Sequence, residues 1–92
     1  MLATTIDQIA NQYLKRALIK CAQKGYQFKE AYIDIPDAGN SIVFGNLDEE
    51  QIREVLSCFP GIDNEPHEME NFAYHYCDTL IFLPDVLPYE NN

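Results

Sequence analysis

Two histidines and three cysteines are the residues of this chain best able to bind a transition metal. His75 and Cys77 stand two positions apart, so on a β-strand their side chains would point to the same face. Structural zinc sites usually take their four ligands from two closely spaced pairs, and the sequence has no C-x-x-C and no second pair around His67 or Cys58. The odd number and wide spacing of the cysteines also argue against a disulfide framework. We therefore predict no metal site, and we expect reduced thiols that serve as small buried hydrophobic side chains.

Catalytic groups are not recognisable either. Ser41 and Ser57 lack the strand-turn-helix context that activates a nucleophile, and the four glycines are isolated rather than gathered in a phosphate-binding loop. The acidic residues of the middle region lack the register and the terminal Glu of a calcium-binding loop. Paired carboxylates such as Glu49 and Glu50 are expected on the solvated surface of a chain with fifteen acidic residues. The sequence thus predicts no catalytic residue and no cofactor, and we expect a non-enzymatic protein.

The distribution of charge is the main functional signal. The chain carries a net charge of -9, but residues 1–30 hold five basic and two acidic side chains, whereas residues 31–92 hold Arg53 against thirteen carboxylates. The sequence is therefore bipolar, with a net charge of +3 in the first part and -12 in the second. An acidic majority of this size repels nucleic-acid phosphates and steers a protein towards basic surfaces.

We expect a partner-binding surface, the acidic face, to lie on the second predicted helix and the segment that follows it. It comprises Asp48, Glu49, Glu50, Glu54, Asp63, Glu65, Glu68 and Glu70. Solubility and the preference for acids at a helix start explain part of this pattern. Soluble domains usually intersperse both signs, however, and no lysine follows residue 30. A basic partner surface would relieve the self-repulsion of these carboxylates.

A second candidate surface, the basic patch, comprises Arg16, Ile19, Lys20 and Gln23. One interpretation is structural: Lys20 would complement a helix C-terminus, and Arg16 and Lys20 would pair with carboxylates elsewhere in the fold. The other is that the patch contacts phosphate or an acidic partner, with Ile19 as an apolar anchor. A net +3 is too small for independent nucleic-acid affinity, but it would allow a secondary contact with a guide RNA on a protein that already holds one.

The first element that must position these residues is an amphipathic helix. We predict that it starts at Thr4 or Thr5, runs to about Lys24 and stops at Gly25. At about 100° per residue its core face would comprise Ile6, Ile9, Ala10, Tyr13, Leu14, Ala17 and Cys21. Ile19 falls in the middle of the opposite, polar face and breaks the pattern.

A β-hairpin is predicted next, from Ala31 to Phe44, because alternating apolar residues flank the turn-forming Pro36–Asn40. The second helix has the clearest start signal in the chain, since Asp48 can cap it and Gln51 completes a capping box. It should bury Ile52, Val55, Leu56 and Phe59 and end at Pro60.

The last third of the sequence is ambiguous. The alternation around Tyr74 and Tyr76 and the apolar run Leu80–Leu83 favour a second hairpin. Met69, Phe72, Ala73 and Tyr76 also have helical spacing, and a helix would shorten the long loop that begins at Pro60. We favour the strands, because aromatic residues dominate the segment.

Both interpretations give one α+β domain over residues 1–92, in which two helices pack on a small antiparallel sheet of three to four strands. The order is helix-hairpin-helix-hairpin, and residues 87–92 are expected to form a flexible tail. No apolar run reaches the length of a membrane span and the N-terminus does not resemble a signal peptide, so we expect a cytoplasmic protein with no membrane partner. The oligomeric state is not predicted.

In size, acidity and lack of catalytic motifs, the chain resembles the small phage-encoded anti-CRISPR and anti-restriction inhibitors. The resemblance implies a stoichiometric inhibitor that blocks the basic nucleic-acid-binding surface of a nuclease or nucleoprotein defence complex. It rests on the character of the whole chain, so it transfers no functional residue. An immunity protein or antitoxin against a basic toxin nuclease would have the same character, and a structural or accessory assembly subunit is a third alternative.

Overall fold

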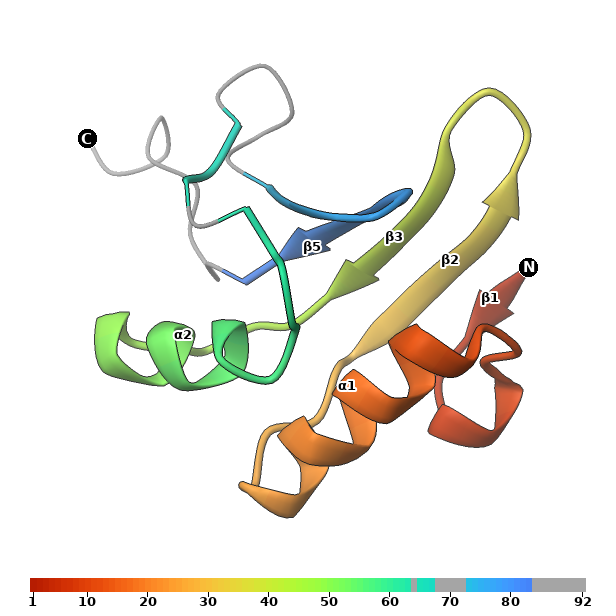
Figure 1. Cartoon of the computed structure of the whole chain (residues 1–92). Helices are drawn as coiled ribbons and strands as arrows, with labels where there is room; N and C mark the ends of the chain where they lie inside the picture. Colours follow the sequence, from red (N-terminus) through yellow and green to blue (C-terminus); the bar gives the residue numbers. More distant parts are fainter. Residues whose placement is uncertain (64, 68–72, 84–92) are drawn as a thin grey trace.

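The computed structural model describes residues 1–63, 65–67 and 73–83. These residues form five strands, two α-helices and one short 3₁₀ helix, η1 (Figure 1). In chain order the elements are β1 (Leu2–Ala3), η1 (Ile6–Gln8), α1 (Gln12–Gln23), β2 (Glu30–Ile35), β3 (Gly39–Val43), α2 (Glu49–Leu56), β4 (Tyr74–Tyr76) and β5 (Thr79–Phe82). The predicted α+β class is confirmed. The order helix-hairpin-helix-hairpin holds from α1 onwards, whereas the strand β1 before it was not predicted.

The strands form a single mixed sheet in the order β1-β2-β3-β5-β4. The neighbours β1 and β2, β2 and β3, and β4 and β5 pair antiparallel, whereas β3 and β5 pair in parallel. The sheet therefore differs from the predicted antiparallel sheet of three to four strands, since it gains the short β1 and one parallel pair. The parallel pair arises because β5 lies inside the sheet, where Ile81 of this strand and Leu83, just after it, are fully buried.

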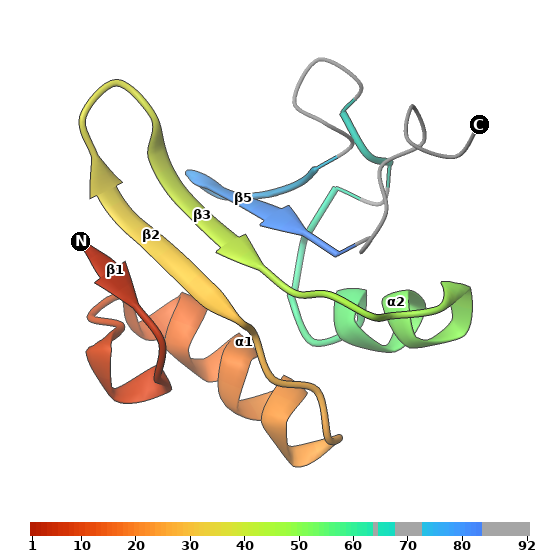
Figure 2. The same ribbon diagram turned by 180° about the vertical axis from the view of Figure 1, so that it is seen from behind.

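One row of side chains crosses the sheet and forms the centre of the core. Ala3 faces Ala31, Ala31 faces Ile42, and Ile42 faces Ile81, and all four are fully buried. Buried side chains of α1 and α2 join the same hydrophobic cluster, including Leu14, Leu18 and Val55. Both helices lie on the same side of the strands, below them in Figures 1 and 2. Their outer faces are therefore left for other contacts.

The first predicted helix is broken into two pieces. Residues 6–8 form the 3₁₀ helix, Ile9 is extended with φ -91° and ψ 116°, and α1 begins only at Gln12. The Asn11 side chain accepts a hydrogen bond from the backbone N–H of Leu14 at 3.0 Å, so Asn11 caps a new helix. At the other end Gly25 has φ +92°, as predicted, and the Tyr26 N–H donates to the Cys21 carbonyl at 2.9 Å in a Schellman motif.

The break changes which residues of α1 face the core. Leu14, Ala17 and Cys21 are buried as predicted, but Tyr13 is 70% exposed and Ala10 is exposed as well. The prediction assumed one continuous helical phase from Ile6, and the extended residue at Ile9 resets that phase. Tyr13 consequently lies on the outer face of α1.

The second helix follows its predicted start. The Asp48 carboxylate accepts from the Gln51 N–H at 2.8 Å, and the Gln51 side chain accepts from the Asp48 N–H at 2.9 Å, which completes the capping box. Val55 and Phe59 are buried as predicted, while Ile52 and Leu56 are half-buried against the same cluster. The capping prediction is confirmed in both of its hydrogen bonds.

In the last third, β4 and β5 form the favoured second hairpin, joined by the two-residue turn Cys77–Asp78. The helical alternative is wrong for Tyr74–Tyr76. The predictions for Met69, Phe72 and the tail at 87–92 lie outside the described residues.

Candidate functional site

Four residues of the predicted acidic face lie in or next to α2, and all four are exposed: Asp48, Glu49, Glu50 and Glu54. Glu49 accepts from Arg53 at 3.1 Å, and both side chains are largely exposed, so this pair contributes little stability. Glu54 accepts a hydrogen bond from the Tyr26 hydroxyl at 2.9 Å. The charges of α2 therefore remain accessible from solvent.

Tyr26 is a residue of this surface that the sequence did not indicate. The hydrogen bond to Glu54 raises the pKa of the Tyr26 phenol above its usual range, with further contributions from desolvation and from the charges of Glu54, Asp48 and Glu50. Tyr26 thus lies among the carboxylates of α2, although it is 28 positions from Glu54 in the chain. No local pattern could have predicted such a contact.

Asp63 and Glu65 are also exposed, but their hydrogen bonds serve a different cluster. The Asp63 carboxylate accepts from the Glu65 N–H at 3.1 Å and lies 3.2 Å from the His67 Nε2. These two hydrogen bonds, the backbone one first, lower the pKa of Asp63 below its usual range, and the nearby imidazoles act in the same direction. The other two members of the predicted acidic face, Glu68 and Glu70, lie outside the described residues.

The two histidines of the chain stack on each other. The ring centroids of His67 and His75 are 4.1 Å apart, with 23° between the ring planes. Cys77 does not lie on the strand of His75, as a same-face pair would require, but in the turn after it, with φ 54°. Within residues 1–63, 65–67 and 73–83, no three His, Cys, Asp or Glu side chains come together in a way that could hold a metal ion.

The cysteines are all free thiols. Cys21 and Cys58 are buried as predicted, and desolvation together with the neighbouring Cys58 raises the pKa of Cys21 far above its usual range. Cys77 is exposed, so the prediction of a buried hydrophobic role is wrong for this residue. Its place in a tight turn, rather than within a strand, turns the thiol outwards.

The basic patch lies on the outer face of α1, and its four residues Arg16, Ile19, Lys20 and Gln23 are exposed as predicted. Ile19 is 40% exposed. Among the residues that the structure describes, no carboxylate pairs with Arg16 or Lys20. The ion-pair part of the structural interpretation therefore receives no support from the described part of the chain. Its other part is confirmed, since Lys20 lies in the last turn of α1, where a cation complements the helix C-terminus.

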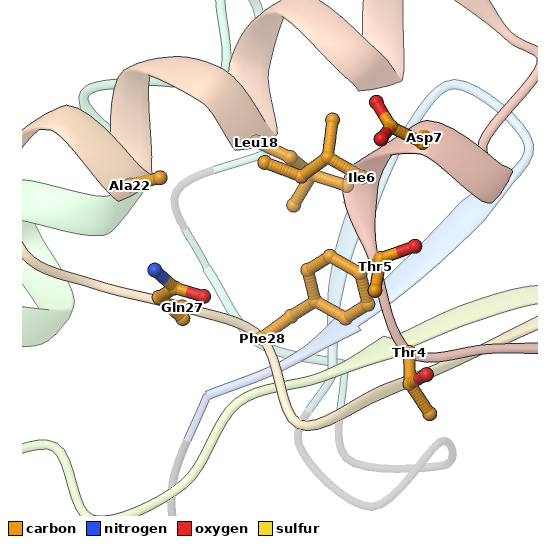
Figure 3. Close-up of a pocket in the computed structure, with 8 residues that line it drawn as sticks. All are labelled: Thr4, Thr5, Ile6, Asp7, Leu18, Ala22, Gln27 and Phe28. Carbon is orange, nitrogen blue, oxygen red and sulfur yellow. The ribbon is translucent and has the colours of Figure 1, made fainter.

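A pocket of about 160 Å³ lies between η1, α1 and the chain that leads into β2. In Figure 3, Ile6 and Leu18 face Phe28 across this pocket, with Gln27 at one end and Thr4 and Thr5 at the other. Small-molecule sites usually measure about 300–1,000 Å³. The pocket is therefore too small for a typical ligand, and the charged helix surfaces are the stronger functional candidates.

Comparison of the chain with models of protein families, with curated proteins and with solved structures found no match. None of the helices in the described part of the chain has the length and apolar character needed to cross a membrane.

Proposed function

We propose that this protein is a non-enzymatic, stoichiometric inhibitor that binds a nuclease or nucleoprotein defence complex, of CRISPR-Cas or restriction type, and blocks its basic nucleic-acid-binding surface. The carboxylates of α2 would take the place of target phosphates against lysines and arginines of the partner. The proposal places the protein in the cytoplasm, which three free cysteines support.

The observation that carries this proposal is the unbalanced charge of α2. Four exposed carboxylates lie within seven positions, and the one cation among them, Arg53, is already paired with Glu49. Such a surface is repelled by free nucleic acid and attracted to the proteins that bind it. The exposed Glu50 adds a further charge to this surface, and Tyr26, hydrogen-bonded to Glu54, adds a partly apolar ring.

Affinity capture from the native host tests the proposal. The bait is the tagged protein, compared with a Glu50→Lys/Glu54→Lys variant and with an Asp7→Lys/Asp78→Lys variant that changes the net charge equally at exposed acids away from α2. The wild type and the control should recover the same nucleic-acid-processing complex, and the α2 variant should recover roughly tenfold less of it. The captured nuclease should then be inhibited at about one equivalent of protein.

Two results would overturn the proposal. One is the recovery of no nucleic-acid-processing protein at low or moderate salt. The other is an equal loss of binding in both charge variants, since binding would then follow net charge rather than the α2 surface. Recovery of a toxin nuclease encoded beside the gene would instead favour the immunity-protein alternative, which draws on the same carboxylates.

A further inference from the structure

The outer face of α1 combines cations with large exposed apolar side chains. α1 contains no acidic residue, and Tyr13, Arg16 and Lys20 follow one another at spacings of three and four, so they lie on one continuous side of the helix. Ile19 lies three positions after Arg16 and Gln23 lies seven positions after it. Both therefore extend the same side of the helix. We call these five residues the α1 strip.

The apolar part of the strip makes it more than a solvated cationic face. Tyr13 is 70% exposed and Ile19 is 40% exposed, and they account for two of the five large exposed hydrophobic residues in the described chain. Single exposed apolar residues are common on protein surfaces. Tyr and Arg, however, are among the residue types that are enriched at the energetically important centres of interfaces.

The chain itself carries a surface that complements the strip. Arg16 and Lys20 are four positions apart on α1, and Glu50 and Glu54 are four positions apart on α2. Four residues rise by about 6 Å in an α-helix, so two opposed helices would align both pairs of opposite charge at once. The matched spacing is a specific form of charge complementarity.

We infer that the α1 strip is a docking surface for α2 of a second copy of this chain. Both helices lie on the same side of the sheet (Figures 1 and 2), so a two-fold axis between the copies would set each α1 against the partner's α2. Each contact would then be made twice, and the assembly would close as a dimer. Tyr13 and Ile19 supply the apolar contacts within it.

The net charge of -9 opposes this association, but it acts over longer distances than the proposed ion pairs. At physiological ionic strength charges farther apart than about 8 Å are largely screened, whereas pairs in contact are screened less. We expect a weak dimer that high salt weakens further. The inference does not depend on the proposed inhibition, although the dimer would cover the same α2 carboxylates and the two kinds of binding would compete.

Sedimentation velocity of the purified chain tests the inference without any other partner. Across protein concentrations from about 5 to 500 μM, the wild type should shift from monomer to dimer. Arg16→Glu/Lys20→Glu and Glu50→Lys/Glu54→Lys should each associate at least about tenfold more weakly, because like charges then face each other in both contacts. Asp37→Lys/Glu65→Lys makes the same charge change as the α2 variant at exposed acids outside α1, η1 and α2, and it should still dimerise.

An equal mixture of the two helix variants gives the decisive result. In a mixed dimer the reversed α1 of one copy meets the reversed α2 of the other, and the native helices meet in the second contact, so association should return to about the wild-type level. Far-UV circular dichroism of each variant checks that it is folded. Association of the mixture would show in addition that both variants can still bind. A wild type that stays monomeric up to 500 μM, or a mixture that associates no better than its components, would overturn the inference.

Discussion

Asp63 holds the segment after α2 against the edge strand β4. Its backbone N–H donates to the His75 carbonyl at 3.1 Å, and the His67 N–H donates to the Ala73 carbonyl at 2.8 Å. Its carboxylate accepts from Glu65 and lies within hydrogen-bond distance of His67, whose ring stacks on His75. A single ionised side chain thus organises several neighbouring contacts.

Stability should therefore depend on the charge of Asp63. Because the folded state lowers the pKa of this carboxyl below its usual 3.8, the ionised form stabilises the protein above that pH, and the contribution is lost as the pH falls through the folded pKa. Asp63→Asn should be less stable than the wild type at pH 6, and the difference should shrink below about pH 4. Urea unfolding of both proteins across this range measures it. A difference that stays constant with pH would contradict the prediction.

Cys77 is a residue whose chemistry and backbone both set it apart. It is the exposed thiol, and its φ of 54° lies in the left-handed region that side chains other than glycine disfavour. In the native protein one thiol should react rapidly with a disulfide reagent, whereas Cys21 and Cys58 should react only after unfolding. Rapid reaction of all three thiols would contradict the buried positions of the latter two.

Replacing Cys77 by glycine should stabilise the fold. Glycine adopts positive φ without steric cost, so Cys77→Gly should raise the free energy of unfolding by up to about 1 kcal/mol. Asp78→Gly is the matched control, because Asp78 does not have a positive φ and should lose stability through increased chain entropy. Urea unfolding of the two variants separates relief of backbone strain from a general effect of glycine in the turn.

At the scale of elements, the two helices show what local sequence can and cannot predict. The capping box of α2 is encoded within four consecutive residues, so both of its hydrogen bonds were predictable. α1 begins after the Asn11 cap rather than at the predicted Thr4 or Thr5, and the break before it depends on Ile9 entering the core. Burial of Ile9 is a tertiary effect, and for this reason the exposed position of Tyr13 could not be predicted.

The cap of α2 provides a test at this scale. Asp48→Ala removes an acceptor for the Gln51 N–H and should lower the free energy of unfolding by about 0.5–2 kcal/mol. Glu50→Ala removes an exposed acid from the same first turn without removing the cap, so it should change stability by less than about 0.5 kcal/mol. Thermal and urea unfolding measure both variants. Equal losses would show that charge near the helix start, rather than the cap, provides the stability.

At the scale of the whole molecule, the alternation of apolar residues predicted the two hairpins β2–β3 and β4–β5, but neither the short β1 nor the order of the strands in the sheet. The alternation of apolar and polar residues along a strand does not depend on which strand lies next to it. The parallel pairing of β3 with β5 was therefore not predictable. The same limit applies to the candidate site. Exposure of α2's acids and α1's cations followed from helical spacing, whereas the Tyr26–Glu54 bond and the stack of His67 on His75 depend on chain segments brought together by the sheet.

The charge of the whole molecule should make its stability depend on salt. Fifteen acidic side chains repel one another more in the compact state than in the unfolded chain, and added salt screens that repulsion. Between about 20 and 500 mM NaCl the Tm should rise, by about 4–8 °C for each 1 kcal/mol gained. Asp7→Lys/Asp78→Lys, which lowers the net charge, should show a smaller rise. A Tm that falls with salt would show that ion pairs outweigh repulsion.

The position of β5 also bears on how the protein is synthesised. β3 must wait for its parallel neighbour until the 35 residues between Val43 and Thr79 have left the ribosome, about 2–7 s at usual elongation rates. During that interval β3 has an unpaired edge, which is prone to pair with other nascent chains. The same 35 residues carry nine acidic side chains and only Arg53 as a cation. Their mutual repulsion should keep neighbouring nascent chains apart until β5 closes the sheet.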